Sequence, residues 1–303
     1  MKRKRKLKKK VKIIFYITCI LIITFITVLV TQFNKNDNKN DKDNVITEQK
    51  KSQNKKEKNT FTKKCKKLKY CDIKKKKRYE SYQEKNKDLS FEDVITRVNL
   101  NLDYSFYTQT KETPALNKDY ILVNKYLYLT NNYVPENLES IPTSYARSGM
   151  KLVKTAKDKF VEMAESASKD GYKVIAMSSY RSYDYQVDLY NNYVKSDGVE
   201  AADTYSARAG FSEHQTGLCV DVYDGNLPYT SFEQSPSFNW MKENAHKYGF
   251  ILRFPKDKEN ITGYQYESWH YRYVGVDIAT YIHKNNITFE EYYVRFIEPK
   301  LEK

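Results

Sequence analysis

The stretch SEHQTGLCVDV, residues 212–222, ends in a pattern with a period of two. Apolar side chains occupy every second position, and they are Leu218, Val220 and Val222. This alternation predicts a strand with one apolar face, because successive side chains of a strand point to opposite sides. Cys219 and Asp221 then share the other face, so the strand presents a thiol and a carboxylate away from the core.

His214 precedes this strand in the same stretch. It lies seven positions before Asp221, which is too far for one helical turn and out of phase for one strand. Gly217 stands between the two residues and suits a tight turn of the backbone. The sequence therefore predicts that a loop presents His214 and that the strand brings Asp221 back toward it.

A second segment, YESWHYRYVG at 266–275, places Glu267 and His270 three positions apart in an aromatic, strand-like context. The chain has four histidines. Two of them, His246 and His283, fall in predicted helices, where an ordinary structural role is expected. The histidines of the two quoted segments are therefore the candidates for chemistry.

Two imidazoles and one carboxylate suit a catalytic zinc ion, which keeps its fourth position open for water. The predicted ligands are His214, Asp221 and His270. Zinc lowers the pKa of bound water to roughly 7, and attack still needs a base to take the proton. Glu267 is the spare carboxylate for that role. The rival is a 2-His-1-carboxylate iron oxygenase, but such sites usually have a shorter ligand spacing and no use for Glu267.

A third segment, SSYRSYDYQ at 178–186, places Arg181 at the end of a predicted strand. The side chain of Arg181 is either an ordinary surface cation or a group that holds a substrate carbonyl and its developing negative charge. The residues alone leave both interpretations open.

These three segments, with GYQYE before the last, closely resemble the motifs of VanY-type D-alanyl-D-alanine carboxypeptidases. That family belongs to the LAS group of zinc peptidases, which also includes D-Ala-D-Ala dipeptidases and the hedgehog-like fold. The resemblance runs from about Asp88 to the C-terminus, and its motifs lie between Ser178 and Gly275. Three motifs in the same order make it specific.

The resemblance implies a role for each matching residue. The Zn²⁺ ligands would be His214, Asp221 and His270. Glu267 would be the catalytic base that later protonates the leaving amine, and Arg181 would polarise the scissile carbonyl. Gln186 and Ser212 would help to hold the end of the peptide.

Cys219 departs from the family, in which alanine is more common at this position. Because Cys219 shares a strand face with Asp221, its thiol could lie near the metal. A small buried side chain is the favoured interpretation.

The reaction that the resemblance implies is attack by zinc-bound hydroxide on the peptide bond before a terminal D-alanine of a peptidoglycan stem peptide. An L,D-carboxypeptidase and a peptidoglycan endopeptidase of the same fold are alternatives, because the sequence does not show the pocket walls that separate them. A non-catalytic module that binds the cell wall is a more remote alternative, since all the site residues are present.

The N-terminus predicts a membrane anchor. The chain begins MKRKRKLKKK and then runs from Ile13 to Val30 without a charge. A helix of that length spans roughly 27 Å, close to the hydrocarbon thickness of a bilayer. The basic residues 1–12 predict a cytoplasmic N-terminus and an extracellular remainder. No small-x-small site follows Val30, so an uncleaved signal anchor is favoured over a cleaved signal peptide.

Residues 31–87 are predicted to form a polar, Lys-rich linker, because they offer almost nothing to bury. Residues 1–85 carry 28 Lys and Arg against 8 Asp and Glu, which leaves 25 against 30 in residues 86–303. The positive charge therefore lies in the anchor flank and the linker, which argues against a nucleic-acid partner. Anionic lipid or an anionic wall polymer is the expected contact, with a solvated spacer as the alternative. Cys65 and Cys71 could pair or stay free.

Residues 88–303 are predicted to form a single α+β domain with a mixed or antiparallel sheet and flanking helices. Strands are expected within 119–129, 172–180 and 218–223. Apolar residues at helical spacing predict an amphipathic helix over 144–169. The sequence does not predict the oligomeric state.

Overall fold

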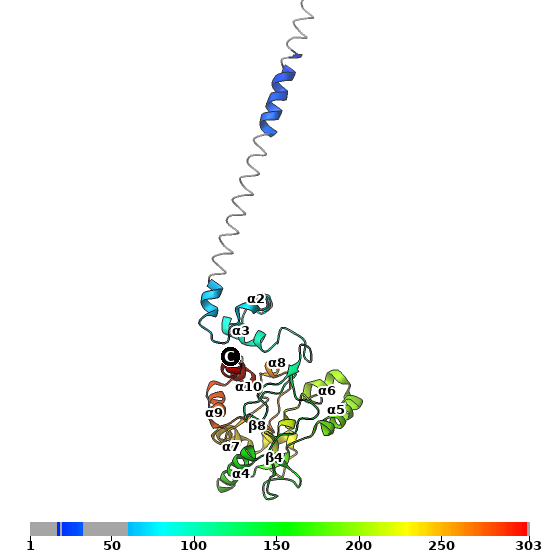
Figure 1. Cartoon of the computed structure of the whole chain (residues 1–303), viewed down its shortest axis with the longest axis vertical. Helices are drawn as coiled ribbons and strands as arrows, with labels where there is room; N and C mark the ends of the chain where they lie inside the picture. The colour runs from blue at the N-terminus through cyan, green and yellow to red at the C-terminus, as the bar shows by residue number, and fades with distance from the viewer. Residues whose placement is uncertain (1–16, 19, 33–59, 302–303) are drawn as a thin grey trace, which may run out of the picture. The chain divides into compact units, whose positions relative to one another are not determined.

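The computed structural model describes residues 17–18, 20–32 and 60–301 (Figure 1). The chain divides into two compact units, Met1–Lys67 and Leu68–Lys303. The three sequence segments that predict the site all belong to the second unit.

In the first unit, residues 17–18 and 20–32 are helical, and their large apolar side chains are exposed. Among the residues that the structure describes, no helix is both long enough and apolar enough to cross a bilayer. The predicted anchor at 13–30 lies partly outside the described residues, and the predicted cytoplasmic segment 1–12 lies wholly outside them.

A four-stranded antiparallel sheet organises the second unit, in the order β5-β6-β8-β7. Its strands are β5 (Ile175–Ser178), β6 (Cys219–Tyr223), β7 (Phe250–Leu252) and β8 (His270–Tyr273). The stretches 212–222 and 266–275 supply the two central strands. The predicted α+β class with an antiparallel sheet is therefore confirmed.

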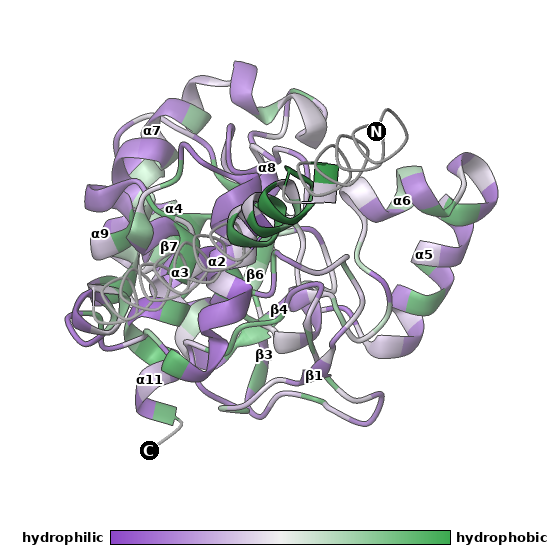
Figure 2. Cartoon of the chain, turned by 90° about the horizontal axis from the view of Figure 1, so that it is seen from above, coloured by the Kyte–Doolittle hydropathy of each residue, from purple (hydrophilic) through white to green (hydrophobic). Residues whose placement is uncertain are grey.

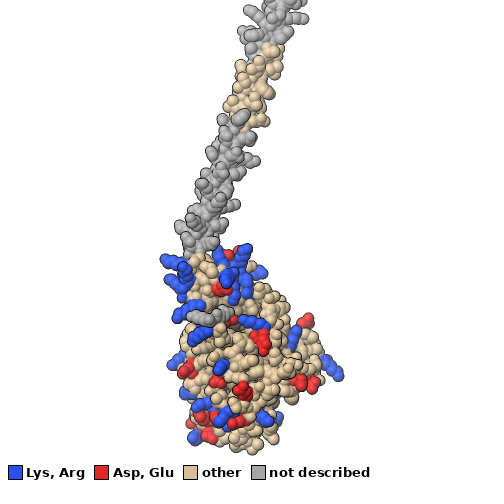
Figure 3. All heavy atoms as spheres, viewed as in Figure 1, with Lys and Arg blue, Asp and Glu red and all other residues tan. Residues whose placement is uncertain are grey.

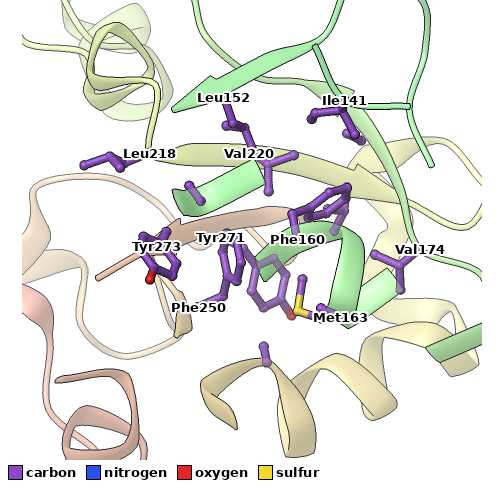
Figure 4. Close-up of a cluster of buried hydrophobic side chains, with 14 of the residues drawn as sticks. Ile141, Leu152, Phe160, Met163, Val174, Leu218, Val220, Phe250, Tyr271 and Tyr273 are labelled. Carbon is purple, nitrogen blue, oxygen red and sulfur yellow. The ribbon is translucent and has the colours of Figure 1, made fainter. Parts of the chain in front are cut away.

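One face of this sheet is apolar and packs against α4 (Lys154–Lys169). Val220 of β6 and Tyr271 of β8 point toward Phe160 and Met163 of the helix (Figure 4). All four side chains are at most 1% exposed. Complete burial of a large apolar side chain stabilises a fold by about 1.5–3 kcal/mol, so this contact fixes which face of the sheet is left for the site.

The helix predicted over 144–169 is shorter than expected, because α4 begins only at Lys154. The residues before it form β4 (Lys151–Val153), which pairs antiparallel with β3 (Leu138–Ser140). Met150 also packs against the core, but from an extended segment. Because Met150 is apolar and fits the helical spacing, the sequence pattern predicted a helix that starts before Lys154, the first residue of α4.

Helices lie on either side of the sheet (Figure 2). In both views α5 (Tyr183–Asp197) and α6 (Val199–Tyr205) lie on one flank, and α4, α7 (Pro236–Asn244) and α9 (Val276–Asn285) lie on the other. Within 119–129 only β2 (Leu127–Tyr128) forms, parallel to β1 (Lys111–Glu112). The remaining short helices are α8 (Glu259–Thr262), α10 (Phe289–Tyr292) and α11 (Glu298–Leu301).

The folded unit begins earlier than the predicted domain boundary at residue 88, so the linker predicted over 31–87 needs correction. The second unit starts at Leu68, and α2 (Lys76–Lys85) packs against α3 (Phe91–Asn99). Figure 3 shows Lys and Arg gathered over α2, whereas both signs of charge mix over the rest of the visible face. The Lys-rich segment predicted as a linker therefore contains a folded helix, α2, at its C-terminal end.

A few long side chains hold α2 in place. Arg78 donates from Nε and Nη2 to the carboxylate of Asp103, at 2.7 and 2.6 Å. Tyr79 is 1% exposed, and its hydroxyl donates to a side chain of α3. Composition alone missed this helix because it has so few apolar residues. Cys65 and Cys71 are each disulfide-bonded, which answers the question that the sequence left open.

Lys125 is a buried cation just before β2. Its Nζ donates to the carbonyl of Asp203 in α6, at 2.6 Å, and lies 4.7 Å from the ring centre of Phe106 and 4.4 Å from that of Tyr264. The residue is only 3% exposed, and burial lowers the pKa of Lys125 to about 8. It ties the segment before β2 to the α5–α6 flank.

We expect Lys125 to make stability rise with pH. Between about pH 8 and pH 10 the unfolded chain holds a proton at this position that the folded chain has already released. The free energy of unfolding of the wild type, relative to Lys125→Met, should therefore increase by up to about 1.4 kcal/mol per pH unit across this window. Urea unfolding of both proteins across the window measures the difference, and a constant difference would contradict the prediction.

Candidate metal centre

The turn before β6 presents His214, as predicted. His214 lies in the 3₁₀ turn Glu213–Thr216, which ends at Gly217 with a left-handed φ of 67°. Nδ1 of His214 lies 2.7 Å from the carbonyl oxygen of Ser179. The proton is therefore assigned to Nδ1, and the lone pair to Nε2. Nε2 is buried and has no hydrogen-bond partner in the described part of the chain.

The register of the sheet brings Asp221 and His270 together. They are direct partners across β6 and β8, on the face opposite the apolar core. Nδ1 of His270 lies 3.4 Å from Oδ1 of Asp221, and Nε2 of His214 lies 3.5 Å from Oδ2 of Asp221. The three predicted ligands converge from two strands and one turn, and each is at most 7% exposed.

This donor set fits a divalent metal ion. Nε2 of His214 and Oδ1 of Asp221 are buried without a hydrogen-bond partner among the described residues. Buried polar atoms are rarely left unpaired, so each such atom needs an explanation. Two imidazole nitrogens and one carboxylate supply three positions of a tetrahedral zinc site and leave the fourth open. A zinc ion would satisfy both unpaired atoms.

The charges of the cluster support the same conclusion. Burial and the neighbouring Arg181 lower the pKa of His214, but Cys219 and Asp221 outweigh them and raise it to about 9. Burial raises the pKa of Asp221, yet the two histidines hold it well below its usual range. The site therefore favours positive charge beside the carboxylate, and a metal dication supplies that charge.

Glu267 lies just before β8, beside the ligands. Its Oε2 is 3.2 Å from Nδ1 of His270, and its side chain is buried. The backbone N–H of Glu267 donates to the carbonyl of Phe254 at 3.1 Å, which fixes the chain at this point. Burial raises the pKa of Glu267, and His270 only partly offsets this. A carboxyl group with a raised pKa is suited to proton exchange near neutral pH.

A cavity of about 410 Å³ opens beside these groups. It is lined by every site residue predicted from the sequence, namely Arg181, Gln186, Ser212, His214, Asp221, Glu267 and His270. Nε of Arg181 is buried without a partner in the described chain. Gln186 donates to the carbonyl of Ala207 at 2.7 Å and leaves its Oε1 unpaired in the same part of the structure. The structure brings these residues together, and their individual roles stay predictions.

Sequence reasoning missed Glu213, the residue before His214. Oε1 of Glu213 accepts a hydrogen bond from Nε2 of His270 at 2.9 Å, which leaves Nδ1 of that ring free for the site. The other oxygen accepts from Nε of Arg253 at 2.8 Å and from Nη1 of Arg272 at 3.2 Å. A carboxylate behind a ligating histidine fixes the ring orientation. The sequence did contain a signal for this role, because Glu213 is an acidic residue directly before His214, a predicted metal ligand.

Glu213→Gln is expected to weaken zinc binding by about 10–100-fold. The amide can still accept a hydrogen bond from His270, but it lacks the negative charge that increases the basicity of the ring. Zinc titration against a competing chelator measures the change. Glu290→Gln is a matched control, because Glu290 also accepts from Arg253, at 2.9 Å, whereas the carboxylate that accepts from His270 is that of Glu213. Equal zinc affinity in the two variants would contradict the prediction.

The structure shows where Cys219, His246 and His283 lie relative to the site. Cys219 is a free cysteine and is fully buried, so the prediction of a small buried side chain at this position is confirmed. One donor atom from each of His214, Cys219 and His270 lies within 4.8 Å of the other two. His246 and His283 stack with ring centres 3.9 Å apart and are not among the residues that line the cavity.

A family model described as "VanY: D-alanyl-D-alanine carboxypeptidase" matches residues 149–276. Among curated proteins, the chain is 40% identical over 185 residues to "Putative carboxypeptidase YodJ" of Bacillus subtilis (strain 168). The match covers 57% of this chain and 66% of that protein, so the chain spans slightly less than two thirds of this relative.

Solved structures are also similar. The LdcB LD-carboxypeptidase matches with a TM-score of 0.54 and 40% identity, over 57% of this chain and 85% of that chain. A mutant of the vancomycin resistance D,D-pentapeptidase VanY, from a VanB-type cassette and in complex with Zn(II), matches with a TM-score of 0.51 and 33% identity. This match covers 57% of the present chain and 98% of that chain, so it includes nearly the whole of that domain.

Proposed function

The chain belongs to the VanY family of D-alanyl-D-alanine carboxypeptidases, and on this basis we propose that it is a zinc-dependent carboxypeptidase. The proposed reaction is hydrolysis of the peptide bond before the terminal D-alanine of a peptidoglycan stem peptide. One observation carries the proposal: Nε2 of His214, Nδ1 of His270 and the carboxylate of Asp221 converge beside Glu267 at the wall of a cavity.

Each residue has a defined task in this reaction. Zinc held by the two histidines and Asp221 would act as a Lewis acid and lower the pKa of a water molecule to roughly 7. Glu267 takes the proton of the attacking water and passes it to the leaving amine. Arg181 stabilises the negative charge that develops on the carbonyl oxygen. Glu213 keeps Nδ1 of His270 directed at the site.

The proposed specificity is for a D-Ala-D-Ala end, held by Gln186 and Ser212. The family description and the VanY D,D-pentapeptidase support it, whereas the similar LdcB is an LD-carboxypeptidase. Mass spectrometry of three digests separates the possibilities. Loss of D-alanine from a pentapeptide stem alone supports D,D-specificity. Loss from a tetrapeptide stem would replace it with L,D-specificity, and cleavage of a cross-linked dimer would replace it with endopeptidase activity.

The zinc assignment has a direct test. The zinc-loaded chain should release D-alanine from a pentapeptide stem and stop when a chelator removes the metal. His270→Ala should lose both metal and turnover, because one of three ligands is gone, whereas His283→Ala should keep both. If the wild type binds zinc but releases no D-alanine, and Glu267→Ala binds the peptide equally well, a non-catalytic wall-binding module would be the better assignment.

We also propose that the chain is a single-pass membrane protein with its N-terminus in the cytoplasm and its catalytic unit outside the cell. The uncharged residues 13–30 behind the basic residues 1–12 support this topology. The Lys-rich segment after the anchor would then contact anionic lipid or an anionic wall polymer. Protease added to intact protoplasts should digest the catalytic unit, and its full protection there would contradict the topology.

A further inference from the structure

Cys219 is a free and fully buried thiol at the start of β6. It lies two residues before Asp221, so both side chains are on the face of the sheet that carries the site. One donor atom each from Cys219, His214 and His270 lie within 4.8 Å of one another. The proposed hydrolysis assigns no role to this thiol.

The spacing of these three donors is somewhat wider than that of ligands around a bound ion. At a tetrahedral angle, a Zn–S bond of about 2.3 Å and a Zn–N bond of about 2.0–2.1 Å place the two donor atoms roughly 3.5 Å apart, so an ion would have to draw the donors together by about 1 Å. Nε2 of His214 is buried and unpaired within the described chain, so its lone pair, which lies in the plane of the ring, is available to a metal ion. Cys219 is therefore part of a buried donor cluster and not an isolated thiol.

The two possible third ligands differ in chemistry. The carboxylate of Asp221 is a hard ligand, whereas the thiolate of Cys219 is soft and selects thiophilic ions. Both would share His214 and His270, so two overlapping triads that prefer different metals meet at these two histidines, with Cys219 buried behind the residues that line the cavity.

We propose that Cys219 is a metal ligand of this chain, and that with His214 and His270 it forms a second triad that binds thiophilic divalent ions such as Cd²⁺. This inference rests on the proposed zinc site, because both histidines belong to it. On binding, the thiol gives up its proton to solvent and the sulfur donates an electron pair to the ion. A thiophilic ion held in this way displaces zinc from the triad that contains Asp221 and so inhibits the hydrolysis.

The test uses Cd²⁺ and the full chain carrying Cys19→Ser, so that the thiol of Cys19 does not contribute. Because Cys65 and Cys71 are disulfide-bonded, they supply no thiolate. Cd²⁺ should produce a sulfur-to-metal charge-transfer band in the ultraviolet, and Cys219→Ala and Cys219→Ser should both abolish it. Cd²⁺ affinity should fall by roughly tenfold or more in both variants.

Asp221→Asn separates the two triads. It should retain the charge-transfer band, because the triad of His214, Cys219 and His270 is intact, and the double variant Cys219→Ala/Asp221→Asn should lose Cd²⁺ binding. A wild-type protein that binds Cd²⁺ without the band, or a band that persists in Cys219→Ala, would overturn the proposal.

The readouts also distinguish this proposal from the proposed function. If zinc binds and D-alanine is released, but no thiolate band forms with Cd²⁺, only the role of Cys219 fails. If neither ion binds to the wild type, the zinc site itself fails, and the inference fails with it.

Discussion

Glu267→Gln should leave zinc bound and lower kcat for D-alanine release by about 10²–10⁴-fold, the range that positioned acid–base groups contribute. The amide has nearly the same shape as the carboxylate, so the cavity keeps its form. It can accept a hydrogen bond but cannot take a proton from water. The loss should therefore fall on kcat, with little change in the metal content of the protein.

The position of the Glu267 carboxylate in the structure supports this expectation. Oε2 of Glu267 lies 3.2 Å from Nδ1 of His270, the atom assigned to the metal, so the carboxylate reaches the place where water would be activated. The backbone N–H of Glu267 donates to the carbonyl of Phe254, which fixes the main chain from which the side chain extends. Burial raises the pKa of Glu267, and a base tuned toward neutral pH is a more effective partner for the leaving amine.

Metal analysis and stem-peptide turnover, measured on the same preparation, check the prediction. Glu259→Gln is the matched control, because it makes the same change at an exposed glutamate of α8 that is not among the cavity-lining residues. If kcat of Glu267→Gln were within a few-fold of the wild-type value, Glu267 would not be the general base, because loss of the base should lower kcat by at least about 10²-fold.

The local part of this site could be predicted because it depends on short-range patterns. The two-residue period of β6 correctly placed Asp221 opposite the apolar face, and Gly217 correctly indicated the turn that presents His214. In contrast, the pairing of Asp221 with His270 depends on the register between two distant strands. The residue types of the two segments predicted that they share a metal ion, but no local pattern predicted the register that makes Asp221 and His270 direct partners.

The supporting shell of the site could not be predicted in the same way. Glu213, Arg253 and Arg272 are charged, and charged residues are almost never fully buried unless they are paired. A sequence read locally therefore places each of them in solvent. Their pairing depends on tertiary contacts between the turn before β6, the end of β7, and β8.

The same limitation explains the errors at element boundaries. Met150 continued the helical spacing of α4 from an extended segment, because a core contact does not report the backbone conformation of the residue that makes it. At the linker, the contacts of Arg78 with Asp103 stabilise α2 without an apolar signal in the sequence.

Arg253→Met should reduce the free energy of unfolding by about 3–5 kcal/mol, the cost of breaking a buried ion pair on one side. Arg253 is 1% exposed and lies between two buried carboxylates. It donates from Nε to Glu213 at 2.8 Å, and from Nη1 and Nη2 to Glu290 at 2.9 and 2.5 Å. Methionine fills much of the same volume, so the main loss is the charge that compensates both acids.

Urea unfolding of the metal-free protein measures this loss without a contribution from zinc. Lys159→Met is the matched control, because it breaks a 2.7 Å pair with Glu162 that is exposed on α4 and should cost no more than about 1 kcal/mol. The double variant Arg253→Met/Glu290→Leu should recover part of the stability, since one of the two uncompensated carboxylates is then gone. A loss in Arg253→Met no larger than in Lys159→Met would mean that the buried acids find other partners. In that case Glu213 would be held behind His270 by Arg272 alone.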